Sequence, residues 1–225
     1  MAFVSRIPAL IATAVLAMSL AGTAASAAQS DDPPEVTPAE KAQFDKRMFQ
    51  KDPAPKAKTY ACFVRKYDAD HLAQHKDQKV TSMKLLFTSE LMEGNTELDR
   101  NFRLGMTFRH KRGVYDSSGS CHFFHPQDAK DKTEVRYGCG VDCDGGGIDI
   151  AMKPDDAAVL VRVERVRIWQ NNKPEEDSND ELTAGKDDAI FRLDRAPLEE
   201  CRSLVTDRKE LADMRSVNNR VSSRK

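Results

Sequence analysis

Apolar and polar residues alternate along most of the chain between residues 59 and 194. In the clearest stretch, over 100–110, every second position is apolar: Phe102, Leu104, Met106 and Phe108. This period of two is typical of a β-strand with one buried face. The same alternation, or a shorter strand-like run, occurs over 59–67, 83–91, 118–125, 135–141, 148–152, 158–169 and 189–194. The pattern therefore predicts about eight strands joined by short polar connections.

The charged outer face of each predicted strand indicates an antiparallel sheet, because parallel strands are normally covered on both faces. We therefore expect a mostly-β fold, an antiparallel meander that forms a small barrel or a sandwich, with the barrel preferred. In 158–169 the apolar phase changes between Val163 and Val166. A phase change inside one strand predicts a β-bulge near Glu164 and Arg165.

Short helices are expected at both ends of the β domain. Thr37, Pro38 and Glu40 have the form of a capping box, which predicts a helix over about 38–49. A second helical pattern begins near Pro197. The expected organisation is a signal peptide (1–27), a flexible leader with the short helix and a linker (28–57), the β domain (58–206) and a polar tail or helix extension (207–225).

The first 27 residues have the three parts of a secretory signal peptide. One charge, Arg6, precedes an apolar run from Ile7 to Gly22, and small residues then lead to a suitable cleavage site that ends at Ala27. The apolar run is shorter than the roughly 20 residues that an ordinary bilayer span needs, so an N-terminal membrane anchor is the less favoured alternative. We expect cleavage near Ala27 and a periplasmic or secreted protein.

The charge balance argues against two classes of partner. The formal net charge of the whole chain is −1, with Lys+Arg 35 and Asp+Glu 36. Nucleic acids and anionic membranes select a strong basic excess, which this chain lacks. Beyond the signal peptide there is no second long apolar run, so we expect no integral membrane span in the mature chain. The partners themselves are unknown at this stage.

The chain contains five cysteines, and in an oxidising compartment they are expected to form disulfides. One pair follows from strand register. A hairpin whose turn is centred on Lys130 puts Cys121 opposite Cys139. The same register puts Phe123 opposite Tyr137, an aromatic cross-strand pair. Directly opposed residues meet the limit of about 7 Å between Cα atoms that a disulfide needs.

The sequence does not decide the second disulfide. Cys143 is expected to pair with Cys201 or with Cys62, and the Cys143–Cys201 pair is one of these two alternatives. Because the number of cysteines is odd, at least one thiol is left over or pairs between chains.

Three acids, Asp142, Asp144 and Asp149, surround a run of glycines and make a weak candidate for a calcium site. An EF-hand that starts at Asp142 would have Gly146 and Lys153 at positions where acids belong, and no flanking helices are expected. The interpretation we favour is a tight hairpin turn between 141 and 148, in which the glycines supply positive φ angles.

No stretch of the sequence carries a specific catalytic or cofactor motif. A zinc site from Cys121, Cys139 and two histidines is disfavoured, because a strand points His122 and His125 to opposite faces. The serines before Cys121 do not form a nucleophile elbow. The chain also lacks a phosphate-binding glycine loop, a dinucleotide fingerprint and a haem attachment motif. We therefore assign no catalytic residue and no cofactor.

The sequence alone leaves the function open. The leading hypothesis is a non-enzymatic exported protein that binds a partner or a small ligand, or has a structural role. The alternatives are a hydrolase-type enzyme that uses polar groups around 116–125 and 142–149, and a metal-binding module on the Asp142–Asp149 loop. A pocket with converging acids and histidines favours the enzyme, whereas a filled barrel without a cleft favours a structural role.

Overall fold

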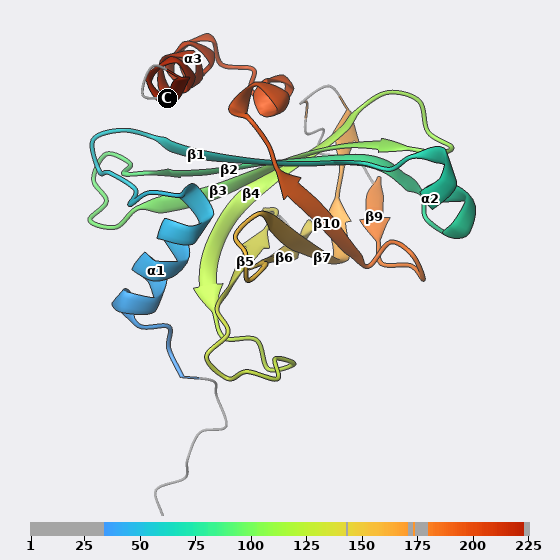
Figure 1. Cartoon of the computed structure of the whole chain (residues 1–225), viewed down its shortest axis with the longest axis horizontal. Helices are drawn as coiled ribbons and strands as arrows, with labels where there is room; N and C mark the ends of the chain where they lie inside the picture. The colour runs from blue at the N-terminus through green and yellow to red at the C-terminus, as the bar shows by residue number, and fades with distance from the viewer. Residues whose placement is uncertain (1–33, 143, 171–172, 174–179, 223–225) are drawn as a thin grey trace, which may run out of the picture. The chain divides into compact units, whose positions relative to one another are not determined.

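Eight strands form a closed antiparallel barrel in the computed structural model, which describes residues 34–142, 144–170, 173 and 180–222 (Figure 1). The barrel strands are β1 (Thr59–Lys66), β2 (Val80–Glu90), β3 (Asp99–Phe108), β4 (Tyr115–Phe124), β5 (Arg136–Gly140), β6 (Gly146–Met152), β7 (Ala158–Arg167) and β10 (Ile190–Arg195). From β1 to β7 each strand pairs with the next, and β10 closes the barrel by pairing with both β7 and β1. The predicted antiparallel barrel is confirmed, and the sandwich alternative is excluded. The predicted signal peptide lies outside the described residues.

Two short strands extend the barrel wall on one side. β8 (Trp169–Gln170) pairs with β4. β9 (Glu181–Thr183) pairs with the last part of β7, beyond the residues of β7 that pair with β10. A short helix, α2 (Ala69–Gln74), connects β1 to β2. These additions leave the order of the barrel strands unchanged.

The alternation of the sequence sorts side chains between the two faces of the barrel wall. Apolar residues of every barrel strand meet in one interior cluster. The largest of its fully buried side chains include four phenylalanines and a tyrosine: Phe63, Phe87, Phe102, Phe191 and Tyr137. The interior of the barrel is therefore a packed core.

The predicted N-terminal helix is present as α1 (Pro38–Phe49), and it covers the end of the barrel at which β3 begins and β4 ends (Figure 1). The expected capping box starts the helix: the Glu40 N–H donates to the Thr37 hydroxyl at 3.3 Å, and the Thr37 N–H donates to the Glu40 carboxylate at 2.8 Å. The apolar face of α1 joins the core through Phe44, Met48 and Phe49.

A buried ion pair fixes α1 to the barrel wall. Asp45 of α1 is 3% exposed, and its carboxylate accepts hydrogen bonds from Arg100 of β3, the shortest at 2.6 Å. The Tyr137 hydroxyl of β5 donates to the same carboxylate. Burial raises the pKa of Tyr137 well above its ordinary value, and the Asp45 charge adds to the rise, so the hydroxyl keeps its proton and can donate.

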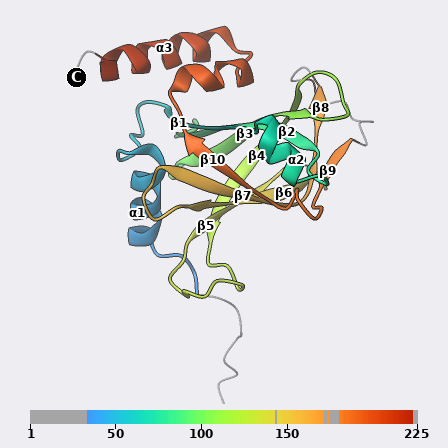
Figure 2. The same ribbon diagram turned by 45° about the vertical axis from the view of Figure 1, so that its right-hand side comes forward.

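The C-terminal region packs on the outside of the barrel, as Figure 2 shows. The 3₁₀ helix η1 (Leu198–Leu204) and the helix α3 (Arg208–Ser222) cover a second apolar cluster, which lies on the outer face of β1 and β2. The buried members of this cluster are Tyr60, Cys62, Leu86, Cys201, Leu204, Val205 and Met214. The helical pattern expected from Pro197 onward is thus present in two pieces. None of the helices in the described residues is both long and apolar enough to cross a membrane.

The structure contains the predicted Cys121–Cys139 disulfide. It joins directly opposed residues of β4 and β5, whose Cα atoms lie 4.0 Å apart. The register behind the prediction is also present, since Phe123 lies opposite Tyr137.

The second disulfide corrects both alternatives for Cys143, the pair with Cys201 and the pair with Cys62. Cys201 is bonded to Cys62, with a Cα–Cα distance of 5.9 Å. The physical reason is that Cys62 points outward from β1 into the apolar cluster beneath η1, so packing of η1 on the barrel brings the two sulfur atoms together. Cys143 lies outside the described residues, and the two disulfides leave it no other cysteine of this chain as a partner.

Candidate functional site

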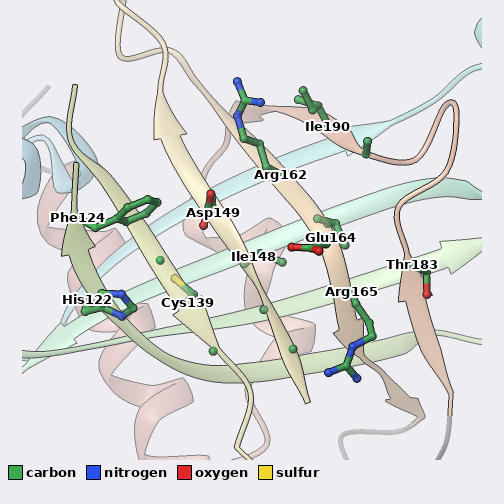
Figure 3. A pocket seen from close by; sticks show the side chains of 16 residues that line it. His122, Phe124, Cys139, Ile148, Asp149, Arg162, Glu164, Arg165, Thr183 and Ile190 are labelled. Carbon is green, nitrogen blue, oxygen red and sulfur yellow. The ribbon is translucent and has the colours of Figure 1, made fainter. Parts of the chain in front are cut away.

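An open groove of about 930 Å³ lies on the outer face of β4 to β7 (Figure 3). Its floor is largely glycine backbone, and charged, aromatic and apolar side chains stand around that floor. The side chains that bear on its chemistry are His122, Phe124, Asp149, Arg162, Glu164, Arg165 and Ile190.

Strand register places four groove residues in one row across the barrel wall. His122 of β4 is paired with Gly138 of β5. Gly138 is paired in turn with Asp149 of β6, which is paired with Arg162 of β7. Directly opposed residues share a face of the sheet. Because Gly138 has no side chain, His122 and Asp149 face each other across two strand spacings, about 10 Å between their Cα atoms.

The glycines of the floor are present for different reasons. Gly146 has a φ of 68°, a backbone conformation that disfavours any other residue. A Cβ on Gly147 would lie 2.2 Å from a carbonyl oxygen of β5, so this position does not tolerate a side chain. Above Gly140 there is open space, because no atom lies within 4 Å of the place that a Cβ would take.

The Asp149 carboxylate is half-buried, and within the described part of the chain it has neither a hydrogen bond nor an ion pair. Burial raises the pKa of Asp149, and the charge of Asp128 adds to the rise. The positive charges of Arg136 and Arg162, together with His122, lower the pKa but do not cancel the rise. A charge held partly out of water without a hydrogen bond is costly, so we expect Asp149 to reduce the stability of the fold.

The two arginines beside Asp149 differ in what else they bind. Arg136 is buried, and its guanidinium donates to Glu134 at 2.6 Å and to Asp128 at 3.0 Å. Arg162 lies 4.0 Å from Asp128, and its Nε is buried without a hydrogen-bond partner. Arg162 is therefore the arginine whose hydrogen-bonding capacity is largely unused.

A β-bulge in β7 adds a second pair of charges to the groove. The register of β7 against β6 shifts by one residue, and Glu164 is the extra residue. Glu164 and Arg165 are consecutive, yet both are exposed and both line the groove. This confirms the bulge that the apolar phase change predicts. Arg165 donates to Glu181 at 2.5 Å, whereas the Glu164 carboxylate has no partner among the residues that the structure describes.

The structure separates the three acids suggested for a metal. Asp142 and Asp144 are exposed in the turn between β5 and β6, which the Val141 N–H closes by donating to the Gly146 carbonyl oxygen at 2.9 Å. Asp149 lies further along, within β6, on the groove face. Across the described ranges, no group of three His, Cys, Asp or Glu side chains is placed to hold a metal ion. The hairpin-turn interpretation is confirmed, because β5 and β6 pair on either side of this turn.

The two histidines near the end of β4 have different surroundings. His122 is exposed at the groove, whereas His125 is buried and its Nδ1 bonds to a backbone carbonyl oxygen at 3.0 Å. Cys121 and Cys139 are bonded to each other, so neither can bind zinc in this state. In the described structure His122 has no hydrogen bond to Asp149 or to a serine hydroxyl, so no nucleophile–base–acid chain is formed.

The sequence pattern predicts no binding role for Arg162 or Glu164. It places His122 only in a disfavoured zinc site and in the 116–125 segment of the enzyme alternative. The signal that could have found the groove is the glycine pattern of β5 and β6. Gly138 and Gly140 occupy alternate positions of β5, and the residues between and beside them face the core. Missing side chains on one face of a strand predict a hollow on that face.

No family model, no curated protein and no solved structure matches the chain. What the groove can do therefore follows from its own side chains. A carboxylate without a partner and a loosely held guanidinium, beside a bare backbone floor, can bind a charged ligand by ion pairing and hydrogen bonding.

Proposed function

We propose that this chain is an exported, non-enzymatic protein that binds a partner segment or a small ligand in the outer groove over β4 to β7. The single observation that carries the proposal is the Asp149 carboxylate, which is half-buried in the groove and makes no hydrogen bond or ion pair in the described part of the chain. Ionisable groups kept in this state occur preferentially at functional sites. A ligand that pairs with Asp149 would offset the cost of its partial burial.

The filled interior of the barrel supports an outer site. A barrel that carries a ligand inside needs space between its inward side chains. Here large side chains from strands around the barrel are fully buried in the interior, and α1 adds further apolar groups at one end: Phe44, Met48 and Phe49. The outer groove offers both room and unsatisfied polar groups.

Export to an oxidising compartment is part of the proposal. The two disulfides are consistent with an extracellular or periplasmic location. The proposed signal peptide, residues 1–27, rests on the sequence pattern. Mass spectrometry of protein recovered from the periplasm is expected to give a chain that begins near Ala28, and an intact Met1 in that material would contradict this part of the proposal.

A hydrolase-type enzyme and a metal-binding module have less support. Strand register does bring His122 and Asp149, one residue from each of the two segments, to one groove, but no hydroxyl lies in hydrogen-bond contact with His122 within the described residues. The acids of the β5–β6 turn are separated from Asp149, as described above. Binding of a ligand needs only the side chains that line the groove, whereas catalysis or metal binding would need a further group.

A groove-filling variant tests the proposal. Gly140→Phe puts a ring into the open space above Gly140, and because nothing conflicts with its Cβ, we expect the variant to fold. Fragments from a general small-molecule library, screened by ligand-observed NMR, are expected to bind the wild-type protein and to bind this variant at least about tenfold more weakly. Val114→Phe changes another exposed position, which does not line the groove, and should bind the same fragments normally. A screen without any fragment that is sensitive to Gly140→Phe would count against the proposed function.

A further inference from the structure

We infer that the groove recognises a basic side chain, arginine or lysine, on an extended segment of a partner polypeptide. This inference rests on the proposed binding function and names the chemistry of its ligand. Three features of the groove support it: the sign of its unpaired charge, the apolar side chains at its two walls and the spacing of its rows.

Of the two arginines of the groove, Arg165 already has close partners, and Arg162 is held only loosely by an acid. Arg165 donates to Glu181 at 2.5 Å and to a backbone carbonyl oxygen of the β5–β6 turn at 2.7 Å. Arg162 lies 4.0 Å from Asp128, at the limit of an ion pair. An anionic ligand would have to compete with these acids.

The two acids of the groove have no such partners. Asp149 stands on the floor and Glu164 on the β7 wall, and Figure 3 shows both carboxylates over the groove. A guanidinium or ammonium group that enters gains a charge-assisted hydrogen bond from Asp149, whose carboxylate has already lost part of its hydration on folding. The pKa of Asp149, raised by burial, agrees with this, because a bound cation would bring it back toward the ordinary value.

Apolar side chains at the two walls of the groove suit the stem of a basic residue. Ile190 of β10 continues the row of Asp149 and Arg162, and it is 49% exposed. Phe124 stands next to His122 on the opposite wall, with a distance of 6.2 Å between their ring centroids. Lysine and arginine pack their alkyl stems on apolar surface while the charged head meets an acid. A hydrated inorganic cation would gain no favourable contact from these apolar side chains.

The spacing of the groove matches that of an extended chain. Outward-facing residues repeat every second position along β5 and β6, which is about 7 Å. An extended segment that lies along these strands has the same repeat. When its basic residue lies at the Asp149 row, the residue two positions further along the segment lies at the next row of the groove. That row contains the paired residues Gly140 and Gly147, and the space above Gly140 is open. The groove therefore has room for a second side chain of the same segment.

Matched peptides test the inference. The probe is a capped heptapeptide with a central arginine and alternating serine and valine elsewhere, and its partner peptide carries citrulline, the uncharged isostere, in place of arginine. In NMR titrations we expect the arginine peptide to bind the wild-type protein at least about tenfold more tightly than the citrulline peptide. Asp149→Asn should remove this difference. Asp142→Asn, which removes an exposed acid outside the groove and changes the net charge equally, should keep it.

The outcomes separate the inference from the proposed function. Equal binding of the arginine peptide to wild type and Asp149→Asn would overturn the assignment of Asp149. N-acetyl-arginine amide tests whether the rest of the polypeptide segment contributes to binding. If it binds as tightly as the heptapeptide, the inference that the ligand is an extended polypeptide segment is overturned. If library fragments occupy the groove while the two peptides bind alike, the inference fails and the proposed function stands. If neither a fragment nor either peptide binds there, both fail.

Discussion

Removal of the Cys62–Cys201 disulfide is expected to destabilise the fold more than removal of the Cys121–Cys139 disulfide. The two bridges close loops of very different length, with sequence separations of 139 and 18 residues. In the chain-entropy treatment of a cross-link, these loops correspond to about 5 and about 3 kcal/mol of stabilisation at 25 °C. The double alanine variants should therefore differ by about 2 kcal/mol in the free energy of unfolding.

The two variants form a matched comparison, because each removes one pair of bonded sulfur atoms. Cys62, Cys201 and Cys139 are buried, whereas Cys121 is partly exposed. The cavity left by the alanines is therefore no larger at the Cys121–Cys139 site. The longer bridge also ties η1 to β1, so its loss weakens the attachment of the C-terminal helices. Both effects act in the same direction as the difference in loop entropy.

Urea unfolding, followed by the fluorescence of the single tryptophan, Trp169, measures these free energies. The variant without the Cys62–Cys201 bridge should unfold at the lowest urea concentration, the variant without the Cys121–Cys139 bridge at a higher one, and the wild type last. Equal midpoints, or the reverse order with equal slopes, would refute the reasoning from loop length.

Two further predictions concern buried charge. Because burial raises the folded-state pKa of Asp149, the folded protein holds this proton more tightly than the unfolded chain, and stability falls as pH rises through the interval between the two pKa values. In thermal melts at a series of pH values, the stability of Asp149→Asn should not show this fall, and at neutral pH the variant should be more stable than the wild type by about 0.5–1 kcal/mol. A variant with the same pH profile as the wild type would contradict this prediction. Asp45→Ala leaves the Arg100 guanidinium without its ion-pair partner and should lower the free energy of unfolding by about 3–5 kcal/mol. Tyr137→Phe removes one hydrogen bond to a charged acceptor and should cost about 1.5–3 kcal/mol, and urea unfolding that reverses this order would contradict the ranking.

The barrel wall and one disulfide were predictable because the information for them is local. Alternation with a period of two assigns both the strands and their buried faces. The connection over 125–135, centred on Lys130, then sets Cys121 against Cys139. The Cys62–Cys201 bridge is different, since 139 residues separate its ends and its geometry depends on how η1 packs over the outer face of β1. Alternation within strands does not encode that packing.

The candidate site was only partly predictable. Proximity in the sequence groups Asp149 with Asp142 and Asp144, as acids around one loop. Register groups it differently, because β6 begins at Gly146 and carries Asp149 away from the turn, into a row with residues of β4 and β7. This row depends on three successive strand pairings, and an error of one residue in any of them would point the side chain to the other face.

The glycines of the groove contain the sequence signal that points most directly to a site on the outer face. Glycine weakens a strand, because it adds no side chain to the sheet and loses much backbone freedom on folding. Gly146 needs its positive φ, and Gly147 lies against a backbone carbonyl group, so the fold itself explains both. Gly140 meets neither condition. A residue that weakens β5 without a steric need is best explained by the space that it leaves, and this space adjoins the row of Asp149.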